Sequence, residues 1–103
     1  MEISTTNKIH GKEIKKHLGL VTGNTIRARH VGRDILAMLK MIVGGEISDY
    51  TKMMSEARDQ ALDRMKEHAQ KAGGNAVIEV RFSTSMVMQG ASEILVYGTA
   101  VEI

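Results

Sequence analysis

Apolar and polar side chains alternate with a period of two over residues 14–30, which is typical of an extended strand. One face of this segment is apolar and carries Leu18, Leu20, Ile26 and Ala28. The run Thr22-Gly23-Asn24 interrupts the alternation, so it is either a hairpin turn or a bend within one long strand. Even-numbered positions stay apolar on both sides of the interruption, which a two-residue turn would not guarantee. The pattern therefore favours one bent strand.

Two further segments repeat apolar residues at three- and four-residue spacing, which predicts helices over 33–43 and from Ser48 or Asp49 to about residue 72. In the first helix, Asp34 lies in the opening turn, where a carboxylate meets the positive end of the helix dipole. The second carries an apolar stripe made of Tyr50, Met53, Met54, Ala57, Ala61, Met65, Ala69 and Ala72. Alanine at successive turns allows close packing, so we expect this helix to lie on a sheet.

Three more segments are predicted to be strands: a short one over 3–6, a longer one over 76–88 and a last one over 93–103. Within the longer one, Ile78, Val80 and Phe82 are expected to share one face. The last strand is largely apolar on both faces, and such a strand needs cover on both sides. Because one chain offers only two predicted helices, a neighbouring subunit is a source of the missing cover.

The composition leaves little material for a core. Among 103 residues there are one Phe, two Tyr and no Trp, so aliphatic side chains and eight Met must fill the interior. A single domain of this size buries only about 60–70% of its unfolded surface. We expect one domain over residues 1–103, and packing between subunits would relieve the shortage of large side chains.

Several classes of protein are excluded by residues that the sequence lacks. The absence of Cys excludes disulfides, thiolate metal sites and a cysteine nucleophile. No stretch approaches the roughly 18 apolar residues that span a bilayer, and residues 1–6 lack the basic and apolar regions of a signal peptide. We therefore expect a cytoplasmic protein without a membrane partner. A net charge of +2 is too small to indicate nucleic acid.

The charge is unevenly distributed along the chain. Residues 1–40 hold eight Lys or Arg against three acids, for +5, whereas residues 41–103 hold six against nine, for −3. Two differently charged solvated faces account for this most simply. The alternative is head-to-tail complementarity between copies in a ring, where unlike patches meet.

Paired glycines join the two predicted helices in Ile42-Val43-Gly44-Gly45-Glu46, and they suit a backbone with positive φ or a close approach to another backbone. This stretch belongs to a series of short motifs spread over the chain: Ser4-Thr5-Thr6, Gly19-Leu20-Val21-Thr22-Gly23, Arg33-Asp34, 42–46 with Tyr50, Ala57-Arg58 with Ala61-Leu62, Gly73-Gly74-Asn75-Ala76-Val77 and Gly98-Thr99-Ala100-Val101. In this order and spacing, the motifs resemble the YbjQ-like family, small prokaryotic proteins of unassigned function that carry a heavy-metal-binding label.

The resemblance implies an α+β subunit of two layers, related to the dodecin arrangement, in which both helices lie on one side of an antiparallel sheet. It also implies a homo-oligomer in the form of a pentameric ring. The family has no established catalytic residues, so the resemblance assigns none to this chain.

The heavy-metal label raises the question of a metal site, for which the candidate ligands are histidines, methionines and carboxylates. The histidines are His10, His17, His30 and His68. No two of them have the four-residue spacing that puts two imidazoles on one helix face. Met86 and Met88 are expected to share one strand face and to offer thioethers to Cu(I), although methionine also fills cores that lack aromatics. The sequence thus identifies no metal site and no cofactor.

A basic cluster provides the candidate ligand site. Arg27 and Arg29 share a strand face and Arg33 opens a helix, so their guanidinium groups can bind a carboxylate or a phosphate. Glu46 and Tyr50 can flank a pocket at the glycine turn. The arginines can equally pair with acids of this chain or of the next subunit, and the acidic C-terminal part favours the latter. In a ring these residues would gather near an axis or a seam, where we expect a small anionic ligand.

Three functions stay open: an assembly module without catalysis that is structural or binds a small ligand, a heavy-metal-binding protein, and an enzyme with a site between subunits. No spacing identifies a nucleophile with its base. Gly44-Gly45 follows a helix and lacks the Lys-Ser or Lys-Thr of a phosphate-binding loop. The first function is preferred because no group of residues requires the others.

Overall fold

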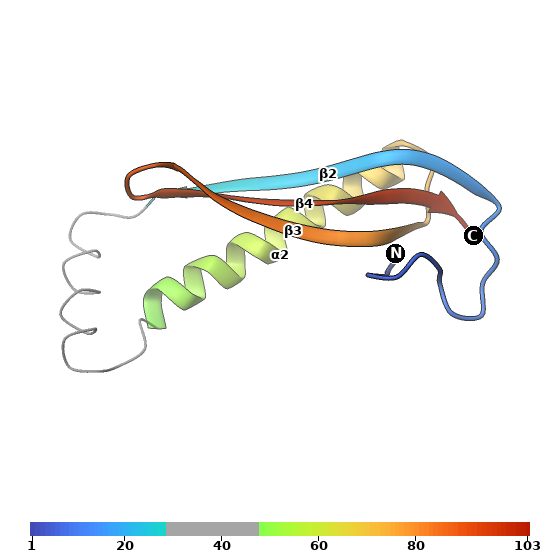
Figure 1. The fold of residues 1–103 in the computed structure, drawn as a ribbon, viewed down its shortest axis with the longest axis horizontal. Helices are drawn as coiled ribbons and strands as arrows, with labels where there is room; N and C mark the ends of the chain where they lie inside the picture. The colour runs from blue at the N-terminus through green and yellow to red at the C-terminus, as the bar shows by residue number, and fades with distance from the viewer. Residues whose placement is uncertain (29–47) are drawn as a thin grey trace.

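The computed structural model describes residues 1–28 and 48–103. Its elements in chain order are β1 (Glu2–Ile3), β2 (Lys16–Ala28), α2 (Ser48–Lys71), β3 (Ala76–Met88) and β4 (Ala91–Glu102), of which Figure 1 labels all but the short β1. These bounds confirm the long strand, the long helix and the two C-terminal strands. The helix expected over 33–43 and the Gly44-Gly45 turn lie outside the described residues.

The four strands form one sheet in the order β1-β3-β4-β2. Strand β4 is antiparallel to both of its neighbours, whereas β1 runs parallel to β3. The expectation of an antiparallel sheet is therefore wrong, because the sheet is mixed. Since β1 and β2 lie at opposite edges and run in the same direction, the segment 4–15 between them has to cross the sheet. It crosses the face opposite α2, where Ile9 is buried.

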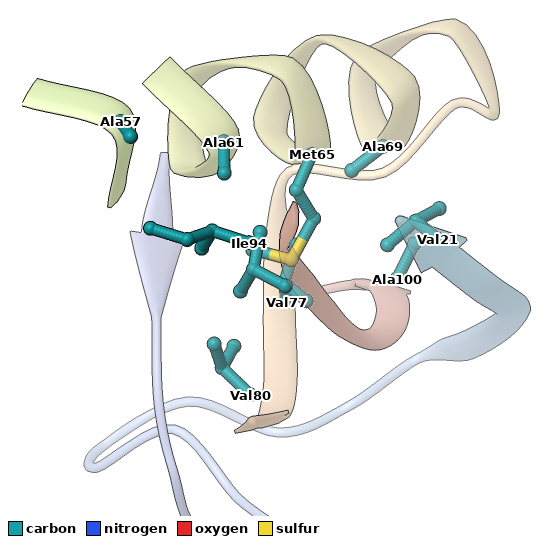
Figure 2. Close-up of a cluster of buried hydrophobic side chains, with 10 residues drawn as sticks. Val21, Ala57, Ala61, Met65, Ala69, Val77, Val80, Ile94 and Ala100 are labelled. Atoms are coloured by element: carbon teal, nitrogen blue, oxygen red, sulfur yellow. The ribbon is translucent and has the colours of Figure 1, made fainter. Parts of the chain in front are cut away.

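Helix α2 lies across β2 and β4 on one face of the sheet (Figure 1). The residues that face the sheet are wholly buried and four apart: Ala57, Ala61, Met65 and Ala69. They pack on apolar residues of three strands, including Val21, Val77, Ile94 and Ala100 (Figure 2). The predicted apolar stripe is thus confirmed over these turns, while Ala72 lies exposed beyond the helix end.

Gly23 lies at a close approach of helix α2 and β2. A Cβ at this position would overlap the carbonyl oxygen of Ala61 and the amide nitrogen of Met65, and it would lie 3.1 Å from the carbonyl carbon of Arg64. Strand β2 pairs with β4 on both sides of Gly23, so the prediction of one continuous strand is confirmed. The glycine serves helix packing, and the irregularity in β2 falls instead just before Gly19, which has a φ of 99°.

The helix leaves uncovered most of the apolar face predicted for β2. Leu18 is the exception, because it packs against the core cluster beneath α2 and is separated from Leu20 by the register shift between His17 and Gly19. Val21 and Thr25 are buried beneath α2, and the Thr25 hydroxyl donates to the carbonyl oxygen of Ala57 at 3.1 Å. Leu20 and Ile26 point to the opposite face and are 69% and 59% exposed. Small and polar residues in the middle of β2 therefore permit close helix packing, whereas Leu20 and Ile26 face away from the helix.

A bulge in β3 moves successive residues to unexpected faces. The register with β4 shifts by one residue between Ile78 and Arg81, and Glu79 has a φ of 53°. Ile78 and Val80 consequently pack in two different apolar clusters. The expectation that Ile78, Val80 and Phe82 share one face is wrong, because a period of two holds only while no extra residue is inserted.

The second cluster covers part of β4 on the face opposite α2. It consists of Ile9, Ala76, Ile78 and Val101, with Ile14 and Ile103 packed against it. The prediction that β4 needs cover on both faces is thus met at this end by the chain's own N-terminal segment, and no neighbouring subunit is required there. The remaining part of the open face lacks this cover.

Large apolar side chains are exposed at the end of the sheet away from the N-terminal segment. Besides Ile26, they include Phe82 at 46%, Met86 at 76% and Met88 at 66% exposure. Leu20 is also exposed, but it lies nearer the N-terminal segment, because its partner Thr99 also pairs with Ile78. Helix α2 contacts β3 only slightly, so Phe82 stays exposed although it pairs with the buried Val96. Both faces of this end therefore present apolar surface to solvent in a single copy.

Candidate ligand-binding site

Polar side chains of α2 follow the outer edge of β2. Nδ1 of His68 accepts a hydrogen bond from the backbone N–H of Thr22 at 3.1 Å. Nη1 of Arg64 donates to the carbonyl oxygen of Asn24 at 2.7 Å. Since the helix satisfies backbone groups on this edge, it blocks the edge against pairing with another strand. His68, one of the four histidines considered as metal ligands, therefore has a structural partner.

Arg27 extends the same line of contacts toward the end of β2. Its Nη2 donates to Oε1 of Gln60 on α2 at 2.7 Å. Its Nε is buried and has no hydrogen-bond partner among the described residues. A buried polar donor without a partner costs free energy, and carboxylates and phosphates satisfy guanidinium donors in pairs. Nε of Arg27 is thus a donor that an anion could satisfy.

Among the described residues, Ser92 joins Gln60 beside Arg27 on the α2 side of the sheet. Ser92 of β4 is the cross-strand partner of Arg27, so the two side chains share a face. The amide of Gln60 contacts Arg27 from the helix above. Sequence patterns did not identify Gln60 or Ser92, because neither lies near Arg27 along the chain. A hydroxyl, an amide and a guanidinium together can hydrogen-bond a small anion.

The other candidate ligand residues are not placed beside Arg27. Arg29, Arg33 and Glu46 lie outside the described residues. Tyr50 belongs to the first turn of α2, but its side chain is also outside the description. The basic cluster beyond Arg27 therefore stays a prediction.

The candidate metal ligands that the structure describes do not converge. His10 lies in the N-terminal segment, His17 near the start of β2 and His68 late in α2, while His30 lies outside the described residues. Within residues 1–28 and 48–103, no group of three His, Asp or Glu side chains could hold a metal ion. A metal site built from these histidines thus finds no geometric support in this part of the chain.

The two methionines of β3 also differ from the expectation. The register shifts between Met86 and Met88, which pair with Ser92 and Ala91 respectively. These partners are consecutive residues of β4, so their side chains point to opposite faces. The expectation that Met86 and Met88 share one face is therefore wrong, and the cause is again an inserted residue, Val87.

An open depression of about 370 Å³ lies at the other end of the molecule and is lined by Glu2, Ile3, Ser4, Ile9 and His10. It forms where the N-terminal segment turns back across the sheet. Its residues come from β1 and from the segment after it, so no periodic pattern in the sequence indicated a depression.

No helix in the part of the chain that the structure describes is long and apolar enough to cross a membrane.

Comparison with known proteins places these features in a family. A family model with the description "Putative heavy-metal-binding" matches residues 1–103. A UPF0145 protein of Methanosarcina acetivorans is 57% identical over 103 residues, covering 100% of this chain and 97% of the relative. A UPF0145 protein of Dehalococcoides mccartyi is 58% identical over 101 residues, covering 98% and 97%.

A solved structure supports the fold. It is a protein of unknown function from Pediococcus pentosaceus, assigned to the DUF74 family, with a TM-score of 0.70 and 21% identity over 100% of this chain and 97% of that one. At 21% sequence identity, the similarity to this structure supports the α+β fold but no conclusion about function. On the match over its whole length and on the identity to its relatives, this chain belongs to the uncharacterised YbjQ-like family of UPF0145 proteins.

Proposed function

We propose that this chain is a non-catalytic assembly module of the cytoplasm, which forms a homo-oligomer, a pentameric ring, and binds a small anion. The observation that carries the proposal is the uncovered apolar surface of the strands. Leu20 and Ile26 are 69% and 59% exposed on the face opposite α2, and Phe82 and Met86 are 46% and 76% exposed on the α2 face. Soluble monomers seldom expose contiguous apolar patches of large area, and such patches mark interaction sites. Identical copies that shield these residues account for the pattern.

The charge distribution supports contacts between unlike parts of neighbouring copies. Residues 1–40 carry eight Lys or Arg against three acids, whereas residues 41–103 carry six against nine. Head-to-tail contacts repeat one interface around a closed ring, and opposite patches favour correct docking. Contacts within a ring therefore explain the uneven charge distribution, and no nucleic-acid or membrane partner is needed to explain it.

Sedimentation equilibrium at micromolar concentration tests the assembly. We expect a single species with five times the 11.3 kDa mass of one chain. Because the proposed contacts are largely apolar, the mass should persist at high salt, where surface ion pairs are screened. A folded species with the mass of one chain would contradict the proposal, whereas a stable oligomer of another size would correct only the ring size.

Anion binding at Arg27 is the second prediction. Replacement of Arg27 by lysine keeps the charge but removes the planar donor group, so we expect the affinity for inorganic phosphate or acetate to fall by about tenfold or more. Isothermal titration of the wild type and the variant measures this change. Arg58→Lys is the matched control, since Arg58 is an exposed arginine of α2.

Two results would contradict anion binding at Arg27. One is that the Arg27→Lys variant binds phosphate as tightly as the Arg58→Lys variant does, and likewise binds acetate as tightly. The other is that native mass spectrometry of the wild type detects no bound small anion, and that isothermal titration with phosphate or acetate gives no heat of binding.

The alternative, heavy-metal binding, is favoured by the family description alone. If it holds, purified protein should contain one ion per chain or per ring by elemental analysis. Retention on a nickel column would not suffice, because exposed histidines such as His10 and His17 account for it. A defined stoichiometry that survives dialysis would make metal binding the better function.

A further inference from the structure

The strand register places an apolar side chain in line with Arg27. Ser92 of β4 pairs with Arg27 of β2 on one side and with Met86 of β3 on the other. Side chains directly opposite each other in neighbouring strands share a face of the sheet, so all three lie on the α2 side. The row leads from a guanidinium through a hydroxyl to a thioether over about 10 Å, since neighbouring strands are about 4.8 Å apart.

Helix α2 does not cover the apolar end of this row. The helix packs on β2 and β4 and contacts β3 only slightly, and Figure 1 shows its first turns lying apart from the end of the β3–β4 hairpin. Met86 is therefore 76% exposed, and Phe82, four residues earlier on the same face of β3, is 46% exposed. A ligand held at Arg27 can extend from there over both side chains.

The polar end of the row offers hydrogen-bond donors. Nε of Arg27 is buried and has no hydrogen-bond partner among the described residues, while Nη2 donates to Oε1 of Gln60 at 2.7 Å. That bond uses the oxygen of Gln60, so the amide N–H groups of the same side chain remain as donors. Ser92 adds a hydroxyl on the same face. Oxygen atoms of an anion are the complementary acceptors.

The charge at this site favours a carboxylate over a phosphate. Among the described residues beside Arg27, Ser92 and Gln60 are neutral, and Arg64, one turn along α2 from Gln60, donates to the carbonyl oxygen of Asn24. A phosphate group carries about −1.5 to −2 charges at pH 7, more than one guanidinium balances. A carboxylate carries a single negative charge, and its two oxygens accept hydrogen bonds from several donors.

We propose that this site binds a monocarboxylate with an alkyl chain, the carboxylate at Arg27 and the chain over Met86 and Phe82. The inference rests on the proposed binding of a small anion and names the chemical class of that anion. Methionine suits an alkyl chain, because its flexible and polarizable thioether adapts to the shape of its neighbour. Leu20 and Ile26, exposed on the opposite face, remain available for contacts between copies.

Isothermal titration of the wild-type protein with octanoate, acetate and inorganic phosphate tests the proposal. We expect octanoate to bind roughly tenfold or more tighter than acetate, because a fully buried methylene strengthens binding by up to about fourfold. Phosphate should bind more weakly than octanoate, because its second charge finds no partner among the described residues. The measured quantity is the ratio of octanoate affinity to acetate affinity.

Met86→Thr and Met88→Thr form a matched pair of variants. Both replace an exposed methionine of β3 by a residue that suits strands. Met86 shares the α2 side with Arg27, whereas Met88 lies on the opposite face. We expect the affinity ratio to fall by about threefold or more in Met86→Thr and to keep its wild-type value in Met88→Thr. Arg27→Lys should weaken the binding of octanoate and acetate alike.

The outcomes separate this inference from the proposed function. If acetate binds in a way that depends on Arg27 and octanoate binds no tighter, the alkyl site is refuted while anion binding stands. The same holds if Met86→Thr and Met88→Thr change the affinity ratio equally. Tighter binding of phosphate than of octanoate refutes the carboxylate class. If none of the three probes binds to the wild type, the inference and the proposed anion binding both fail.

Discussion

Replacement of Gly23 by alanine is expected to lower the free energy of unfolding by about 3 kcal/mol or more. A Cβ at Gly23 would overlap backbone atoms of Ala61 and Met65 in α2, and backbone atoms in the middle of a helix cannot move individually. The whole helix would have to lift from β2, which would open the core around Met65. Thermal unfolding followed by circular dichroism should show a fall in Tm of roughly 10 °C or more at fixed protein concentration.

Gly11→Ala is the matched control for Gly23→Ala. Nothing lies within 4 Å of a Cβ at Gly11, but this glycine has a φ of 74°. Alanine at this position should lower the free energy of unfolding by roughly 1 kcal/mol, because only the strain of a left-handed backbone opposes it. The φ of Gly23 lies outside the left-handed region, so its cost is steric. Equal losses of stability in the two variants would show that the close approach of helix and strand has been misjudged.

Truncation of Met65 to alanine is expected to cost about 2–5 kcal/mol. Met65 is wholly buried and is among the largest fully buried side chains of the described core. It lies between the helix and the strands in Figure 2, beside Ile94 and Val77. The other buried members of this cluster are alanines and valines, which are too small to refill the space. Urea unfolding of variant and wild type, measured at equal protein concentration, gives the difference in free energy.

Met53→Ala serves as the control, because Met53 stands on the same helix and is only partly buried. Met53→Ala should lower the free energy of unfolding by less than about 1 kcal/mol, since removing a partly exposed side chain leaves no closed cavity. If Met65→Ala were as mild as Met53→Ala, the core would have to collapse around the missing thioether. That result would argue against a rigid contact between α2 and the sheet.

Several elements of this fold were predictable because their signals are local. The stripe from Ala57 to Ala69 identified both the helix and its buried face, since a helical period and close-packing alanines point to the same side. The strand predicted over 76–88 has the bounds of β3, whereas the last strand, predicted from 93, begins at Ala91 after a turn in which Gly90 has a φ of 78°. Strand β2 was correctly predicted as continuous through Gly23.

Predictions based on the two-residue alternation of side chains in a strand failed wherever an extra residue is inserted. The bulge at Glu79 separates Ile78 from Val80, and the shift at Val87 separates Met86 from Met88. Nothing in the local sequence marks either insertion, because the residues on both sides read as a regular strand. The parallel pairing of β1 was missed for a related reason, since two residues carry no signal of direction.

The candidate site was predictable only in part. Arg27 stood out as a member of a basic cluster, but its partners come from α2 and β4 and are joined to it by the register of the strands. Sequence patterns could not predict that Nε of Arg27 would be buried without a partner. They also could not reveal that His68 serves the edge of β2.

The sequence by itself determined the long helix, the strands, the shortage of large core residues and the membership of a family, because periodicity, composition and ordered motifs are properties of the chain. Only the tertiary structure decided which strand edge the helix closes, which face of β2 meets the helix, and which donors surround Arg27. These features depend on register and on the close approach of α2 at Gly23. A single inserted residue or a missing Cβ changes such contacts, while the hydrophobic pattern stays almost the same.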